Sequence, residues 1–249
     1  MKYKRVLVIG DIHGHFSKFM SLYNKLKVTA EDLLIFLGDY IDRGNENRKM
    51  LEWIMRESEK ENVIALRGNH EQMLLECFRN QDLMWIYNGG KETFNELRKW
   101  SDENEGIIKD VFKFINRLPL CHMLKIKGQE YFFCHAGVDP KKTLKEQTEE
   151  ELLWIREKFF TEYNGDTIIV VGHTPLMLLR DEIEIAEFFS EFSSVKSIWR
   201  SDEEVYRIKN TKPQWRRNGK VLMLDTGSYM PNGYISCVNL LNGDIWQSD

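Results

Sequence analysis

Histidine, aspartate and asparagine residues stand beside glycines at five separate points in the chain. Their side chains offer imidazole, carboxylate and carbonyl groups, which can bind metal ions or move protons. Arginine, whose planar guanidinium matches the oxygens of a phosphate, belongs to two of these stretches. The five stretches are GDIHG (10–14), GDYIDRG (38–44), RGNHE (67–71), HAG (135–137) and GHT (172–174).

Each stretch follows or ends an apolar run of the kind that forms a buried strand. In open α/β sheets, sites form beyond the carboxyl ends of the strands, so we expect the five stretches to share one site. The runs are RVLVIG (5–10), LLIFLG (33–38), NVIALRG (62–68), EYFFCHAG (130–137) and TIIVVGH (167–173). The side chains expected to meet there are those of Asp11, His13, Asp39, Asn69, His135 and His173.

This set of side chains predicts a site for two divalent ions. Carboxylate, carbonyl and imidazole ligands suit Mn²⁺ best, with Fe, Zn²⁺ or Ni²⁺ as alternatives, and suit Ca²⁺ poorly. Six ligands exceed what one ion with an open position needs, whereas they fit two ions that share a bridging carboxylate. Each motif alone is also typical of a surface turn or of a hydrogen-bonded core histidine. Their joint occurrence favours the metal site, and His15 and His122 fall outside the pattern.

The order of these motifs resembles that of the metallophosphoesterase superfamily, and within it the phosphoprotein phosphatase family. The stretches GNHEQM, NGG, CHA, W-x-R-E, GHTP and DTG are similar to the bacterial and phage type, of which the lambda-phage protein phosphatase is an example. The resemblance covers residues 10–175 and 224–227. It implies an α/β fold, an α/β/β/α sandwich of mixed sheets with the site at the carboxyl ends of the strands.

The resemblance also implies the role of each ligand. Asp11 and His13 hold the first metal, Asp39 bridges, and the second metal is held by Asn69, His135 and His173. A hydroxide shared by the two ions attacks phosphorus in line, without a covalent enzyme intermediate.

His70 is expected to be the general acid. Neighbouring side chains at an extended strand end point in opposite directions, so Asn69 and His70 should not bind the same ion. The resemblance pairs His70 with Asp42, which would orient the imidazole while it donates a proton to the leaving oxygen. For Glu71 the sequence predicts only a supporting place beside the ligands or at a helix start.

Three arginines are expected to bind the phosphate. Arg43 and Arg67 lie beside predicted site residues, and the W-x-R-E resemblance adds Arg156, for which an exposed position on an amphipathic helix is the alternative. Asn69 is expected to contact the phosphate as well as the metal.

The remaining pattern predicts one domain, residues 1–249, with an insertion at about 176–219. Helices are predicted over 17–27, with Ser17 as its cap, and 47–60, and residues 71–118 are expected to be mostly helical, interrupted at 87–90 and 101–106. Two further strand-like runs, 220–227 and 234–240, follow the insertion. Within the insertion, Trp199, Trp215, Arg216 and Arg217 either form a lid over the site or belong to a surface excursion.

Composition limits the remaining possibilities. The 249 residues carry a formal net charge of −4 and include four cysteines without a C-x-x-C pair. This balance gives no bias toward stable binding of nucleic acid or an anionic membrane, and we expect a reduced, cytoplasmic setting. The oligomeric state stays open.

The sequence therefore predicts a dinuclear-metal phosphatase that acts on phosphoserine or phosphothreonine in proteins. The first alternative is symmetrical hydrolysis of diadenosine tetraphosphate, or of another nucleotide or polyphosphate. The second is a non-catalytic metal-binding protein of the same fold.

Overall fold

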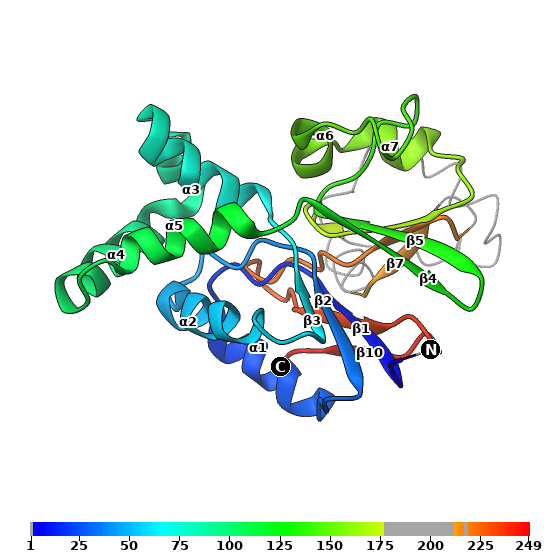
Figure 1. Ribbon diagram of the computed structural model, residues 1–249, viewed down its shortest axis with the longest axis horizontal. Helices are drawn as coiled ribbons and strands as arrows, with labels where there is room; N and C mark the ends of the chain where they lie inside the picture. Colours follow the sequence, from blue (N-terminus) through cyan, green and yellow to red (C-terminus); the bar gives the residue numbers. More distant parts are fainter. Residues whose placement is uncertain (1, 177–211, 217–218) are drawn as a thin grey trace.

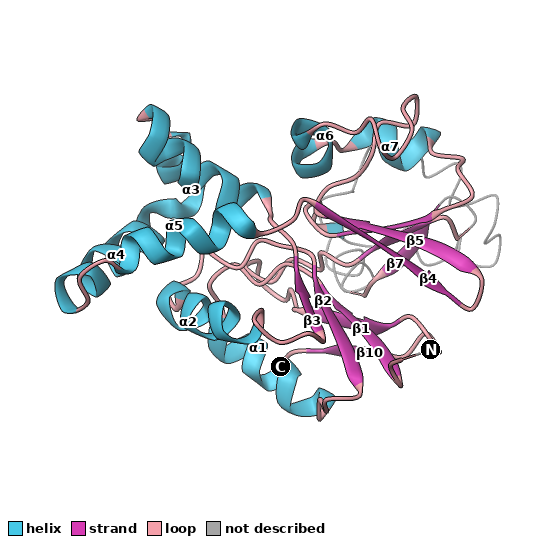
Figure 2. Ribbon diagram, in the orientation of Figure 1, coloured by secondary structure: helices cyan, strands magenta, loops and turns pink. Residues whose placement is uncertain are grey.

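The computed structural model describes residues 2–176, 212–216 and 219–249. In it, two mixed five-stranded sheets are stacked, and one face of each packs against the other (Figures 1 and 2). The first sheet has the order β10-β9-β1-β2-β3, and the second has the order β4-β5-β6-β8-β7. Strand β1 runs parallel to β2, and β2 to β3, while β9 is antiparallel to β1. Strands β5, β6 and β8 are likewise parallel, and β4 and β7 are antiparallel edges.

The strands of the first sheet are β1 (Arg5–Ile9), β2 (Asp32–Phe36), β3 (Val63–Ala65), β9 (Ser236–Asn239) and β10 (Ile245–Gln247). Those of the second are β4 (Cys121–Ile126), β5 (Gln129–Cys134), β6 (Ile168–Val171), β7 (Gln214–Arg216) and β8 (Val221–Met223). The two sheets stack so that the carboxyl ends of their parallel strands lie in the same region of the molecule (Figure 2).

Helices cover the outer faces of both sheets (Figure 1). Helices α1 (Phe16–Leu26) and α2 (Asn47–Glu57) lie on the first sheet, and α6 (Glu149–Trp154) and α7 (Glu157–Glu162) lie on the second. A helical arm projects to one side and consists of α3 (Asn69–Asn80), the π-helical turn η1 (Ile86–Gly90), α4 (Lys91–Glu103) and α5 (Ile107–Arg117). In the described ranges, no helix has the length and apolar character that crossing a bilayer requires.

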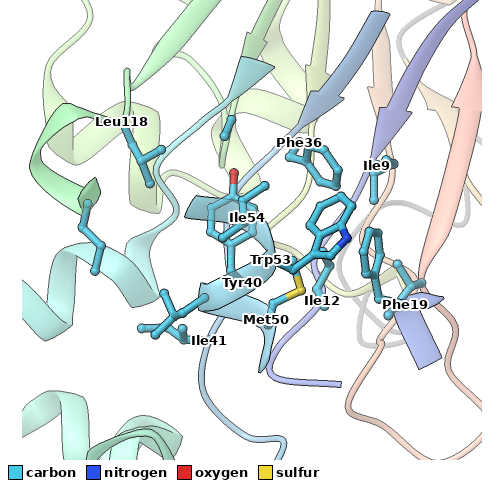
Figure 3. Packing of buried hydrophobic residues seen from close by; sticks show 14 of the residues in the cluster. Ile9, Ile12, Phe19, Phe36, Tyr40, Ile41, Met50, Trp53, Ile54 and Leu118 are labelled. Atoms are coloured by element: carbon cyan, nitrogen blue, oxygen red, sulfur yellow. The ribbon is translucent and has the colours of Figure 1, made fainter. Parts of the chain in front are cut away.

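Alternating side chains along the strands produce this layered core. In β1, Val6 and Val8 point into the cluster between the sheets, whereas Leu7 and Ile9 face the layer of α1 and α2. Figure 3 shows the layer between the first sheet and its two helices, where Trp53 from α2 and Phe19 from α1 pack together with their ring centroids 4.7 Å apart. The second sheet places its outward side chains under α6 and α7 in the same way. The predicted α/β/β/α sandwich is confirmed.

All seven predicted strand runs contain a strand, but three strands were not predicted: β4, β7 and β10. These are sheet edges, and they are short or partly exposed, as Met123 at 50% exposure illustrates in β4. Edge strands lack the continuous apolar run by which buried parallel strands are recognised. The Ser17 cap was wrong, since α1 begins at Phe16 and the Ser17 hydroxyl donates instead to Glu46 at 2.7 Å.

Most of the predicted insertion, 177–211 and 217–218, lies outside the described residues, and so do Trp199 and Arg217. Its last part is not an excursion. Gln214–Arg216 forms β7, which pairs with β8 at the edge of the second sheet, and Trp215 in that strand is 48% exposed.

Candidate active site

Loops at the carboxyl ends of β1, β2, β5 and β6 meet the first turn of α3 in one buried cluster. Asp39 lies at its centre, with Oδ1 3.4 Å from Nε2 of His135 and Oδ2 3.5 Å from Nε2 of His13. Each of the six predicted metal ligands is at most 5% exposed: Asp11, His13, Asp39, Asn69, His135 and His173. The chain thus brings together the residues that the strand ends predicted.

The cluster divides into two halves on either side of Asp39. In one half, Oδ1 of Asn69 lies 2.8 Å from Nε2 of His135 and 3.0 Å from Nδ1 of His173, and these two ring nitrogens are 3.2 Å apart. In the other half, Nε2 of His13 lies 3.9 Å from Oδ2 of Asp11. Imidazole nitrogens and oxygens that converge in this way form a donor set that fits two divalent ions, with one oxygen of Asp39 facing each half.

The electrostatics of the cluster also suit cations. Burial holds the pKa of His13 well below its ordinary value, and burial together with the charge of His135 does the same for His173, which favours the neutral rings that metal binding requires. Burial raises the pKa of Asp11, and the charge of Asp225 raises it further. Burial alone would raise the pKa of Asp39, but the charges of the surrounding histidines, His135 first, hold it well below its ordinary value. Buried carboxylates gathered at this density need positive charge nearby.

The loops that present the cluster have unusual backbone. Of the nine non-glycine residues with positive φ in the described ranges, five are predicted site residues: His13, Asp39, Asp42, Arg43 and His173. Such conformations cost free energy and persist where the surrounding structure enforces them. The glycines of these loops pack directly against the cluster. A Cβ on Gly68 would lie 2.2 Å from Oδ1 of Asp39, and one on Gly172 would lie 2.1 Å from Oδ1 of Asp11, so no larger residue fits at either position.

His70 and Asp42 form a buried pair beside the cluster. Nδ1 of His70 lies 2.7 Å from Oδ2 of Asp42, while its Nε2 faces the cluster, 3.9 Å from Oδ2 of Asp39. The reason given from the sequence was wrong, since Asn69 and His70 are the first two residues of α3 and not an extended strand end. Successive helical positions still direct the two side chains to different partners.

Two of the three predicted phosphate arginines border the cluster. Nη1 of Arg43 lies 3.0 Å from Nε2 of His13, and its guanidinium stacks 4.0 Å from the ring centre of Tyr229. Arg156 donates to Oγ1 of Thr174 at 3.0 Å. It lies between α6 and α7, with φ −128° and ψ −106°, so it is not within a helix, although it is exposed, as the alternative expected.

Arg67 has a different environment. Its guanidinium donates to the carbonyl oxygens of Ile115 at 3.2 Å and Asn116 at 2.9 Å, at the end of α5, and to Oε1 of Gln72 at 3.0 Å. These bonds tie the start of α3 to α5. A role for Arg67 in phosphate binding stays a prediction.

Three residues near the site were not assigned a definite place from the sequence. Glu71, at the third position of α3, accepts backbone N–H groups of the Asp39 loop. Asp225 is buried, which raises its pKa to about 6, and its Oδ2 has no hydrogen-bond partner in the described part of the chain. The Tyr229 ring lies 5.0 Å from that of His13. The run KVLMLDTG ends in an aspartate and a glycine like the other strand runs, a signal that could have identified Asp225.

Comparisons with known proteins agree with this geometry. The family model described as calcineurin-like phosphoesterase matches residues 4–212. Serine/threonine-protein phosphatase 1 of Salmonella typhimurium is 33% identical over 182 residues, which cover 70% of this chain and 80% of the relative. An asymmetrical bis(5'-nucleosyl)-tetraphosphatase of Bacillus mycoides is 30% identical over 203 residues, with coverage of 71% and 80%.

Among solved structures, a protein serine/threonine phosphatase from Saccharomyces cerevisiae superimposes with a TM-score of 0.59 at 17% identity, covering 100% of this chain and 81% of that one. At this identity the likeness shows the fold alone. The family model matches most of the chain, and the Salmonella relative is 33% identical over the aligned residues, so the chain belongs to the calcineurin-like phosphoesterase family.

Proposed function

We propose that this protein is a metal-dependent phosphatase that hydrolyses phosphoserine or phosphothreonine in proteins. The observation that carries the proposal is the adjacency of the His70–Asp42 pair to a buried cluster of side chains that could hold metal ions. A proton donor that faces a cation site is the arrangement that phosphate ester hydrolysis needs, because the leaving oxygen must be protonated as the bond to phosphorus breaks. The similarity to the Salmonella serine/threonine phosphatase supports the choice of substrate.

In this proposal, Asp11, His13 and Asp39 hold one divalent ion, and Asp39, Asn69, His135 and His173 hold the other. Mn²⁺ is the ion we favour, with Fe, Zn²⁺ or Ni²⁺ as alternatives, because the ligands are oxygen and imidazole nitrogen. When bound, the ions would neutralise phosphate charge and lower the pKa of a coordinated water.

The other side chains would orient the ester and handle its proton. Arg43 and Arg156 approach the cluster from opposite halves, through His13 and through the His173–Thr174 segment. Their guanidinium groups would hold phosphate oxygens, assisted by Asn69 and, if it leaves α5, by Arg67. His70 would donate its Nε2 proton to the leaving oxygen while Asp42 holds Nδ1.

A second candidate substrate is a dinucleoside tetraphosphate. The Bacillus relative favours it, since its similarity to this chain extends over 203 residues. That relative is named for asymmetrical cleavage, whereas the sequence alone suggested the symmetrical reaction. A non-catalytic protein of the same fold is disfavoured, because the predicted ligands and the proton-donor pair are all present. A cytoplasmic location and a single domain with an insertion stay predictions.

The test is a comparison of rates on three substrates with added Mn²⁺. p-Nitrophenyl phosphate should be hydrolysed, and a chelator should abolish the reaction. A phosphothreonine peptide should be a better substrate, by kcat/KM, than diadenosine tetraphosphate. The reverse order would favour the second candidate, and no turnover with any of several divalent ions would contradict the enzyme proposal.

A further inference from the structure

The stretch from Trp85 to Gly90 contains the NGG motif of the resemblance, yet no function has been assigned to it so far. Trp85 is fully buried, although an indole carries a polar N–H group. Its Nε1 donates a hydrogen bond of 2.7 Å to Oδ2 of Asp42, the carboxylate oxygen that also accepts from Nδ1 of His70. The helical arm therefore reaches the proton-donor pair directly.

A second group from the arm holds the other carboxylate oxygen. Thr93 in α4 is fully buried, and its hydroxyl donates to Oδ1 of Asp42 at 2.5 Å. The Asp42 backbone N–H in turn donates to Oδ1 of Asn47 at 2.7 Å. With Trp85, Thr93 and His70 as donors, both oxygens of Asp42 are satisfied and the plane of the carboxylate is fixed.

The kink at η1, between the helical turn at Trp85 and α4, shapes the chain for these contacts. Its interior departs from helical geometry at Asn88 and at Gly89, where φ is 102°. A Cβ on Gly90 would lie 2.5 Å from the Trp85 ring, so the indole fits only against glycine. The Gly89 carbonyl accepts the Arg43 backbone N–H at 3.0 Å, which ties the same turn to the next residue of the Asp42 loop.

We propose that Trp85, together with Thr93, is a positioning residue for the proton donor: the two side chains fix Asp42 so that the His70 imidazole keeps Nε2 directed at the leaving oxygen. The inference rests on the proposed function only for its catalytic consequence. Without the indole N–H, Oδ2 of Asp42 loses one of two donors, the carboxylate can rotate, and the imidazole it orients can rotate with it. Proton transfer depends on hydrogen-bond geometry, whereas phosphate binding by the arginines and the metal ligands does not involve Trp85.

The experiment compares two esters that differ in their need for a proton donor. Nitrophenolate leaves readily without protonation, whereas phenolate depends on it more. Trp85→Phe keeps the aromatic ring and removes the N–H. It should lower kcat on phenyl phosphate by about tenfold or more, within the range of general-acid effects, and change kcat on p-nitrophenyl phosphate by less than about threefold. KM for both esters should stay the same.

A matched control is available in the same arm. Trp100 in α4 is also buried, and its ring contacts Arg48. Trp100→Phe should leave the ratio of the two rates unchanged. Thr93→Val should reproduce the selective loss and Thr93→Ser, which restores the hydroxyl, should recover the rate on phenyl phosphate. In a His70→Asn background, Trp85→Phe should have no further effect, since the two changes act through one group.

An equal loss on both esters, or an effect that persists without His70, would overturn the inference while leaving the proposed function intact. If the wild-type protein hydrolyses neither ester, the proposed function fails, and the inference is then judged from proton NMR. The hydrogen-bonded Nδ1–H of His70, assigned by its loss in His70→Asn, should shift in Trp85→Phe and not in Trp100→Phe. An unshifted resonance in Trp85→Phe would contradict the positioning role.

Discussion

The carboxylate of Glu71 accepts the backbone N–H of Asp39 at 2.9 Å, although 32 residues separate them. Its two oxygens also accept the N–H groups of Tyr40 at 2.8 Å and of Gly68 at 2.9 Å. The first turn of α3 thereby clamps the loop that carries Asp39, the residue at the centre of the cluster. The backbone groups that it contacts are all donors, and its ionised form is only an acceptor, although burial and the charge of Asp39 raise the pKa of Glu71 to about 7.

Glu71→Gln should loosen this clamp. The amide replaces one acceptor oxygen by an NH₂ group that faces N–H donors, which should lower the free energy of unfolding by about 1–3 kcal/mol. Mn²⁺ affinity should fall by about ten- to a hundredfold, as expected when a group that supports a ligand is lost. Denaturant unfolding and calorimetric titration measure the two effects. Glu76→Gln, on the same helix but bonded to Gln72, is the control, and equal Mn²⁺ affinity in the two variants would contradict the clamp.

Metal binding should stabilise the folded protein. The cluster is built from distant parts of the chain, so Mn²⁺ should bind only the folded state. At a hundred times its dissociation constant, Mn²⁺ should therefore add about 2.7 kcal/mol to the free energy of unfolding. Thermal unfolding with and without Mn²⁺ measures this. His135→Ala removes a proposed ligand that contacts Asp39 and Asn69, and it should abolish most of the shift. His122→Ala, in β4, should retain it. A full shift in His135→Ala would exclude the proposed ligand set.

His70→Asn should separate proton donation from metal binding. His70 Nε2 lies close enough to Asp39, at 3.9 Å, that a role as a ligand must be tested. As the general acid, its loss should lower kcat on phenyl phosphate, whose leaving group needs a proton, by about 10²- to 10⁴-fold while two Mn²⁺ ions per chain remain bound. Metal content by atomic absorption decides the question, because a fall to one ion per chain would make His70 a ligand.

Asp32 should contribute stability that disappears in acid. The Arg5 guanidinium donates to both of its oxygens, at 2.8 Å and 2.6 Å, and these bonds hold the pKa of Asp32 below its ordinary value of 3.8. Since the folded pKa is the lower one, the stabilisation is complete above the ordinary value and is lost as pH falls through the folded value. Asp32→Asn should therefore cost about 1.5–3 kcal/mol at neutral pH, and this difference should shrink below about pH 4.

The neighbouring pair Lys4–Glu31 provides the control for Asp32. Both of its side chains are more than half exposed, so Glu31→Gln should change the free energy of unfolding by less than about 1 kcal/mol. Urea unfolding across the pH range measures both variants. A penalty for Asp32→Asn that stayed constant in acid would show that packing, and not the ion pair, is its cause.

The sequence by itself determined which types of side chain gather in the cluster and which strands they follow. Asp11, Asp39 and His135 follow buried parallel strands within one to three residues, so a short apolar run and its end locate each of them. Parallel strands bring their carboxyl ends to one edge of a sheet, which accounts for Asp11 and Asp39 in the first sheet and for His135 and His173 in the second, whereas the stacking of the two sheets brings these pairs together. The edge strands β4, β7 and β10 escaped prediction, because strands exposed along one side lack such runs.

Only the tertiary structure decided which groups hold the site residues in place. Trp85 lies 43 residues from Asp42, and no periodicity or spacing in the sequence relates an indole in the arm to a loop after β2. The same holds for Glu71 against Asp39, and for the α5 carbonyl groups that bind Arg67. Local sequence sets the backbone of each element, but a hydrogen bond requires its two partners to be positioned within tenths of an ångström, and only the packing of helices against sheets determines those positions.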